Sequence, residues 1–169
     1  MKFKLTMASL LIALSGQVAA HAHKDHNESA MWDKYQNLAQ KINASVQSAS
    51  MSELAKDSAM LTKLSTKLLP AFVAKQPVCT EYINAAIAAT DTMLNSSLDV
   101  IEKDYHADGK LPKIKAAVCY HAKDMLVHPA TMAVIAKTEA GNEKAREMIA
   151  HELEEVLEHF NQVKQNAGI

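Results

Sequence analysis

The sequence predicts an all-α protein, an up-and-down bundle of four to five amphipathic helices after a cleaved signal peptide. Long stretches of the chain are rich in Ala, Leu, Lys and Glu, which favour helices, and prolines and glycines occur mainly between these stretches. Apolar residues within the stretches recur every three or four positions, and no segment shows the apolar–polar alternation of a half-buried strand. Amphipathic helices joined by short turns pack most simply as an antiparallel bundle.

The first twenty residues have the order of features of a secretory signal peptide. Lys2 and Lys4 give a positive start, residues 5–14 form a mainly apolar run, and residues 18–20 (Val-Ala-Ala) offer small residues to a signal peptidase. The apolar run is too short to span a bilayer, and no later segment has the required length. We therefore expect residues 1–20 to be removed and the protein to be exported, to the periplasm or the medium, without a membrane anchor.

The mature chain is predicted to begin with a flexible, His-rich segment, residues 21–28, followed by one helical domain, residues 29–166. The first helix begins near Ser29, a suitable N-cap, and its inward stripe consists of Trp32, Tyr35, Ala39, Ile42 and Val46. The second helix covers about 52–69, with four leucines inward, and is expected to end before Pro70 because proline breaks helices.

The later helices are predicted from the same two signals, the spacing of apolar residues and the positions of glycines and prolines. The third is predicted for about 80–105, and residues 107–109 (Ala-Asp-Gly) then form a stop and a turn. The fourth starts around Pro112, a favourable first-turn residue, and Pro129 either kinks it or starts a further short helix. The last covers about 142–164 and directs five apolar residues inward: Ile149, Leu153, Val156, Phe160 and Val163.

The two cysteines conflict with an unbroken third helix. Cys79 and Cys119 are expected to pair in an oxidising compartment, and closing that loop would stabilise the fold by roughly 4 kcal/mol. A straight helix from Cys79 to His106 is about 40 Å long, whereas the return to Cys119 covers only about 30 Å. Either the third helix breaks, near Asp91 or residues 95–97, and the disulfide is intramolecular, or the bond joins two chains in a dimer. We favour the intramolecular bond.

Composition and motifs argue against several classes of protein. The chain has a formal net charge of −1, and loss of the two signal lysines makes the mature chain two units more negative, so nucleic acid is not an expected partner. The sequence contains no Gly-rich phosphate loop, nucleophile elbow or Cys-x-x-Cys-His haem attachment motif. We therefore do not expect an enzyme.

Three histidines, His21, His23 and His26, lie at the start of the predicted mature chain. If cleavage follows Ala20, the amine, two backbone nitrogens and the third-position imidazole of His23 can wrap Cu(II) or Ni(II) in a square plane. The segment from His21 to His23 then resembles the amino-terminal copper and nickel motif, which cleavage after Ala22 would abolish. The alternative is a polar tail that only spaces the cleavage site from the domain.

A second group lies on the predicted fourth helix, where His121, Met125 and His128 fall at i, i+4 and i+7 on one face. Two imidazoles and a thioether could hold Cu(I), or one imidazole could bind haem iron. The alternative is structural, with His121 at the edge of the core and His128 capping helix carbonyls before Pro129.

A third group, His151, Glu155 and His159, lies on the last helix at i, i+4 and i+8. Neighbouring ligands on one flank can start a zinc site, but a third ligand must come from elsewhere. The His-Glu-x-x-His pattern of metalloproteases is not met, because Glu155 stands where the second histidine should be. The alternative is a solvated, charged helix face.

These groups predict an exported protein that binds copper, nickel or zinc as a buffer, carrier or sensor. The N-terminal histidines would form its accessible site, and the group on the last helix a second one. The main alternative is a bundle without chemistry that binds a protein partner, such as a chaperone, an inhibitor or an immunity-type protein. Such a bundle would expose an apolar patch of several hundred Å². Haem binding is a third option.

Overall fold

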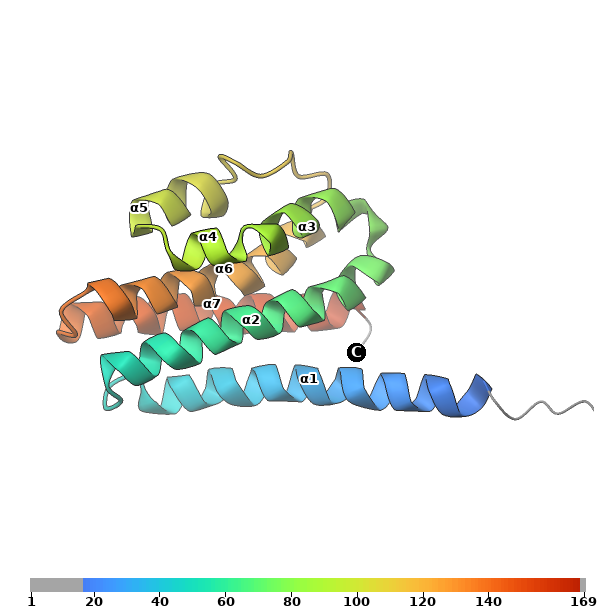
Figure 1. The fold of residues 1–169 in the computed structure, drawn as a ribbon, viewed down its shortest axis with the longest axis horizontal. Coiled ribbons are helices and arrows are strands. Elements are labelled where there is room, and N and C mark those ends of the chain that lie inside the picture. Colours follow the sequence, from blue (N-terminus) through green and yellow to red (C-terminus); the bar gives the residue numbers. More distant parts are fainter. Residues whose placement is uncertain (1–16, 168–169) are drawn as a thin grey trace, which may run out of the picture.

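Helices account for all the regular structure of residues 17–167, the part of the chain that the computed structural model describes, with side chains from residue 29 onward. They are, in chain order, α1 (Gln17–Ser45), α2 (Met51–Lys75), the 3₁₀ turn η1 (Pro77–Cys79), α3 (Thr80–Ala88), α4 (Thr90–Leu94), α5 (Leu98–Ile101), the π-helical turn η2 (Glu102–His106), α6 (Ala117–Thr138) and α7 (Glu143–Ala167) (Figure 1). The prediction of an all-α bundle is confirmed.

The predicted signal peptide falls largely outside the described residues. α1 begins at Gln17, upstream of the expected start near Ser29, and so includes the backbone of the His-rich segment. The side chains of His21, His23 and His26 lie outside the described part. From Trp32 to Val46 the predicted inward stripe of α1 is buried.

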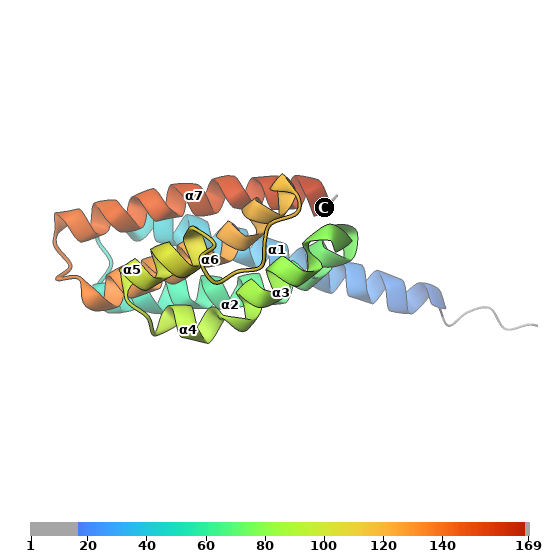
Figure 2. The ribbon, with the colours of Figure 1, turned by 90° about the horizontal axis from the view of Figure 1, so that it is seen from above.

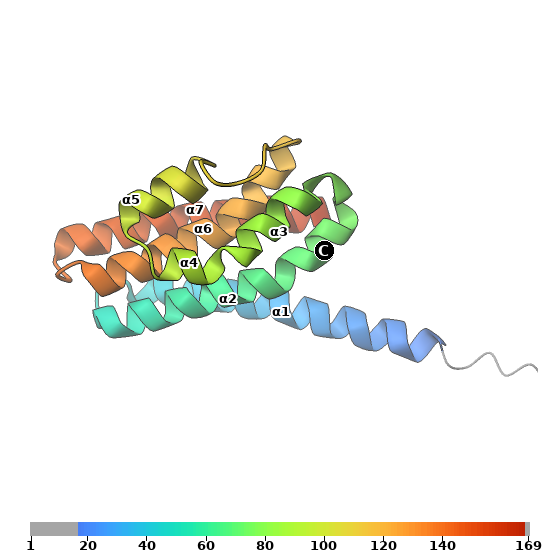
Figure 3. The same cartoon turned by 45° about the horizontal axis from the view of Figure 1, so that its top comes forward.

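The bundle is built around α6. This helix packs most extensively against α7 and α2, while α1 packs on α2 and α7 (Figures 1 and 2). The short helices α3, α4 and α5 cross α6 on the side away from α1 (Figure 3). Because α6 is enclosed on all these sides, almost every residue from 122 to 136 is buried, in place of a single apolar stripe.

α2 extends past the proline that was expected to end it. The helix starts with a capping box, in which Ser50 Oγ accepts from the Glu53 N–H at 3.2 Å and Glu53 Oε2 accepts from the Ser50 N–H at 3.0 Å. It then continues through Pro70 to Lys75, so the predicted end was wrong. Proline removes one backbone hydrogen bond, and burial of Leu69 and Phe72 on either side of it offsets that loss.

The predicted third helix is broken into α3, α4 and α5, as an intramolecular disulfide requires. α3 ends at Ala88, and α4 and α5 are separated by residues 95–97. The side chains of Asn95 and Ser96 bond to carbonyls of the preceding turn at 2.7 Å, a local alternative to helix continuation. Cys79 and Cys119 form an intramolecular disulfide with Cα atoms 5.2 Å apart. The favoured prediction, a bent segment and a bond within one chain, is confirmed.

The start of α6 was predicted wrongly, five residues too early at Pro112. Residues 107–116 instead run without helix from η2 to α6, and Ala116 is extended before the helix begins at Ala117. Pro129 lies inside α6, where its missing N–H leaves the carbonyl of Met125 without a helical partner. That carbonyl accepts hydrogen bonds from Tyr35 Oη at 2.8 Å and Ser65 Oγ at 2.7 Å. Tertiary contacts therefore let the helix continue.

The remaining turns agree with the sequence. Asp108 has a φ of 62°, a conformation that Asp tolerates, and a Cβ at Gly109 would collide with the Lys103 carbonyl. Asn142 caps α7 by accepting from the Ala145 N–H at 3.0 Å. Among the described helices, none combines the length and apolar character that a membrane span needs.

Candidate metal centre

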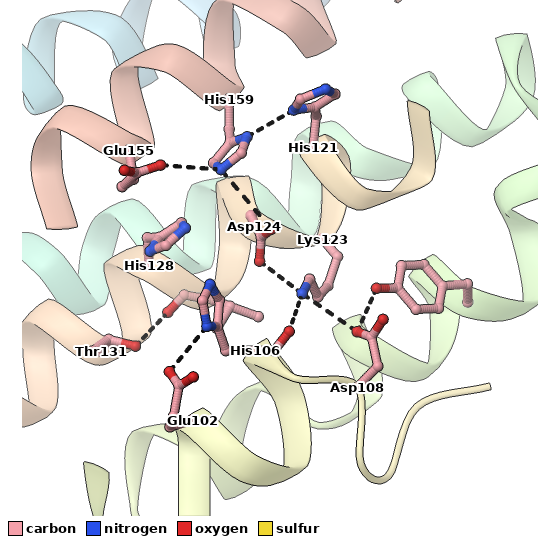
Figure 4. A network of polar contacts seen from close by, with 12 residues as sticks. Glu102, His106, Asp108, His121, Lys123, Asp124, His128, Thr131, Glu155 and His159 are labelled. Carbon is pink, nitrogen blue, oxygen red and sulfur yellow. Dashed lines mark hydrogen bonds and ion pairs between the residues drawn. The ribbon is translucent and has the colours of Figure 1, made fainter. Parts of the chain in front are cut away.

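A group of polar side chains lies inside the apolar core where α6, α7 and η2 meet (Figure 4). Asp124 and Lys123 have no exposed surface, and His128 and His159 are only 5% and 4% exposed. Polar and charged groups lose hydration on burial, so such a cluster costs stability unless its members find partners or a ligand. The atoms that lack partners therefore indicate what the cluster can hold.

Each helix contributes residues on one face. On α6, His121, Asp124 and His128 have spacings of three and four residues, and on α7 Glu152, Glu155 and His159 have the same two spacings. The two helices pack closely along their length, so these faces meet.

His106 comes from the π-helical turn η2. In this turn the Ala107 N–H bonds to the Glu102 carbonyl at 2.8 Å, a five-residue step that is rare and often occurs at functional sites. Lys123 Nζ donates to the His106 carbonyl at 2.6 Å, which ties this turn to α6.

Three imidazoles of the cluster share one arrangement, in which Nδ1 is held by a polar neighbour. His106 Nδ1 lies 2.9 Å from Glu102 Oε2, and His128 Nδ1 lies 2.7 Å from Glu152 Oε2. His159 Nδ1 lies 2.9 Å from the Nδ1 atom of His121. Nε2 is therefore the free nitrogen of each ring, and those of His128 and His159 are buried without a hydrogen-bond partner in the described structure.

Carboxylates complete the cluster. Asp124 Oδ1 forms an ion pair with Lys123 Nζ at 2.9 Å, and Asp124 Oδ2 lies 3.9 Å from His159 Nε2. Glu155 Oε2 lies 3.7 Å from the same nitrogen. Buried imidazole nitrogens and carboxylate oxygens thus lie close together in the cluster.

Two sets of ligand atoms lie close enough to hold a metal ion. His106, Asp124 and His128 form one set, and His128, Glu155 and His159 form the other; within each set the ligand atoms are all within 4.8 Å of one another. Each set offers two imidazoles and one carboxylate, a combination found in catalytic zinc sites and in non-haem iron sites.

The electrostatics of the cluster favour neutral imidazole at His159. Burial, together with the nearby His128 and His121, lowers its pKa from 6.5 to about 3. In the tautomer whose Nδ1–H donates to His121 Nδ1, the neutral ring of His159 presents its lone pair at Nε2. Burial also raises the pKa of Asp124, against the opposing effect of Lys123. A divalent cation would stabilise the ionised carboxylate and use the Nε2 lone pair.

Lys123 supplies the only full positive charge that the described residues place in contact with Asp124. Besides Asp124 and the His106 carbonyl, its Nζ lies 3.4 Å from Asp108 Oδ1 and 4.8 Å from the centre of the Tyr120 ring. Tyr82 Oη donates to Asp108 Oδ1 at 2.6 Å. This network fixes η2 and the turn after it against α6.

No protein family, curated protein or solved structure matches this chain. The chemistry of the cluster therefore carries the functional interpretation.

The structure combines two groups that the sequence presented separately. His121 and His128 from α6 meet Glu155 and His159 from α7, whereas His151 is exposed and belongs to neither ligand set. The Met125 side chain is fully buried and belongs to neither ligand set. The backbone carbonyl of Met125 accepts hydrogen bonds from Tyr35 and Ser65.

His106, Lys123 and Asp124 were not among the residues predicted from the sequence to form the site. A signal for the last two was present: Lys-Asp interrupts an otherwise apolar helix, directly between His121 and His128. His106 had no such signal, because only the break in the third helix turns it toward α6.

Proposed function

We propose that this chain is exported and binds a divalent transition-metal ion in the buried centre between α6, α7 and η2, as a metal buffer, carrier or sensor. The observation that best supports this proposal is the shared arrangement of His106, His128 and His159. In each ring Nδ1 contacts a polar neighbour, and Nε2 remains available beside Asp124. Metal-binding histidines are typically oriented in this way, by a partner on the ring nitrogen that does not bind the metal.

The donor types favour zinc(II), with nickel(II) and copper(II) as competitors. Both cysteines are in the disulfide, so no thiolate is available, and the donors are imidazole nitrogen and carboxylate oxygen. Copper(I), which prefers soft sulfur ligands, fits this set less well. Burial of Asp124, His128 and His159 would enclose the ion, as in sites that hold a metal rather than catalyse with it.

The test is zinc binding by the mature chain, measured by isothermal titration calorimetry and native mass spectrometry. His21, His23 and His26 are first replaced by Ala, so that a proposed N-terminal site for copper or nickel cannot contribute. This background should bind zinc(II) at the buried centre. His128→Gln should weaken binding at least about 100-fold, because it removes the ligand common to both sets.

His151→Gln is the matched control, since it removes an exposed histidine from the same helix as Glu155 and His159. It should leave the affinity unchanged. Absence of zinc binding in the background protein, or equal losses in the His128 and His151 variants, would contradict the proposed function.

A further inference from the structure

The two ligand sets of the centre have one member in common. The η2 set consists of His106, Asp124 and His128, and the α7 set consists of His128, Glu155 and His159. Figure 4 shows His128 between His106 on one side and Glu155 and His159 on the other. Both sets therefore depend on the imidazole of His128.

That imidazole can serve only one ion at a time. His128 Nδ1 is engaged by Glu152 Oε2 at 2.7 Å, which leaves Nε2 as its one buried, unpartnered ring nitrogen. A ring nitrogen has a single lone pair in the plane of the ring, so the two sets cannot be filled together through His128.

We infer that the centre offers two alternative positions for a single metal ion, which keeps His128 and exchanges His106 and Asp124 for Glu155 and His159. This inference rests on the proposed function. Asp124 is suited to the exchange, because Lys123 Nζ contacts its Oδ1 at 2.9 Å, whereas its Oδ2 has no hydrogen-bond partner among the described residues and is already 3.9 Å from His159 Nε2.

The two positions lie toward different parts of the surface. The side chain of His106 is 32% exposed and that of Glu155 is 38% exposed, whereas His128 and Asp124 between them are buried. An ion could thus be taken up beside η2 and released beside α7, or the reverse, with His128 as the ligand that it never leaves. Such ligand exchange suits a protein that passes its metal on.

The test uses cobalt(II), whose visible absorption reports its ligands, in the background without the N-terminal histidines. His106→Gln leaves only the α7 set complete, and Glu155→Gln leaves only the η2 set complete. Both residues are partly exposed, so both variants should fold. Each should bind one cobalt ion with its own spectrum, and the background protein should bind one ion with a spectrum that is a weighted sum of the two.

Glu102→Gln provides a second, milder perturbation, because it changes only the partner of His106 Nδ1. It should shift the weighted spectrum toward that of the α7 set. Two cobalt ions in the background protein, a spectrum that is no weighted sum, or complete loss of binding in either single variant would overturn the inference while leaving a metal centre in place. No cobalt or zinc binding by the background protein would overturn the proposed function as well.

Discussion

Replacement of Lys123 by Met tests whether the buried cluster contains a negative charge, on Asp124, that Lys123 compensates. Lys123 is fully buried, and its Nζ contacts the His106 carbonyl at 2.6 Å and Asp124 Oδ1 at 2.9 Å. Without the ammonium, Asp124 stays buried without a cationic partner. Breaking a buried ion pair from one side costs about 3–5 kcal/mol, so the free energy of unfolding of the metal-free protein should fall by that amount.

The assay is urea denaturation followed by circular dichroism, with Lys115→Met as the control. Lys115 forms an ion pair with Glu81 at 2.8 Å, but both side chains are more than half exposed, so its loss should cost less than about 1 kcal/mol. In an Asp124→Asn background the penalty for Lys123→Met should shrink, because the charge that needs compensation is gone. Zinc(II) at about 100 times its Kd should restore about 2.7 kcal/mol to Lys123→Met.

Two results would refute this reasoning. One is a Lys123→Met variant that is as stable as Lys115→Met, because the buried pair would then be irrelevant to stability. The other is an unchanged penalty in the Asp124→Asn background, which would assign the role of Lys123 to its other contacts, the His106 carbonyl and Asp108.

Three further predictions concern the fold and its response to pH. Reduction of the Cys79–Cys119 disulfide should lower the free energy of unfolding by about 4 kcal/mol in the chain-entropy model, measured by urea denaturation with and without reductant; an unchanged midpoint would contradict it. Tyr35→Phe should cost about 1 kcal/mol in the same assay, because the Met125 carbonyl loses one of its two tertiary donors; a neutral effect would mean that the second donor suffices. His159 has a pKa of about 3 in the fold against 6.5 ordinarily, so between these values the unfolded chain takes up a proton that the fold does not. Acidification from pH 7 to pH 4 should therefore destabilise the metal-free protein more than its His159→Gln variant, and parallel losses would show that His159 is not shielded.

The sequence was informative wherever local spacing decides the structure. The buried stripe from Trp32 to Val46 and the apolar residues of α7 follow directly from three- and four-residue spacing. The disulfide could also be anticipated, because the length of a straight helix after Cys79 is incompatible with the bond. The end of the second helix at Pro70 was predicted wrongly, and the effect of Pro129 was left open between a kink and a new helix. At Pro129, the carbonyl of Met125 is bonded by Tyr35 and Ser65, which are distant in the chain, so local sequence could not decide whether the helix continues.

The candidate site was only half visible in the sequence. His121 and His128 share a face of one helix, and Glu155 and His159 share a face of another, but spacing within a helix does not reveal which helices pack together. Lys123 and Asp124 interrupt an otherwise apolar helix, but charged residues in a helix usually face solvent, so the interruption was not interpreted as burial. His106 depended on a π-helical turn, which helical periodicity does not predict.

The most direct test of the metal centre is anomalous X-ray diffraction at the zinc absorption edge from crystals of the mature protein grown with zinc(II). Zinc bound in the centre should give an anomalous peak about 2.0–2.1 Å from His128 Nε2. That peak should lie on the side of Asp124 and His106, on the side of Glu155 and His159, or be divided between the two. A structure in which zinc occupies only the N-terminal histidines or surface carboxylates, with no peak within bonding distance of His128 Nε2, would contradict it.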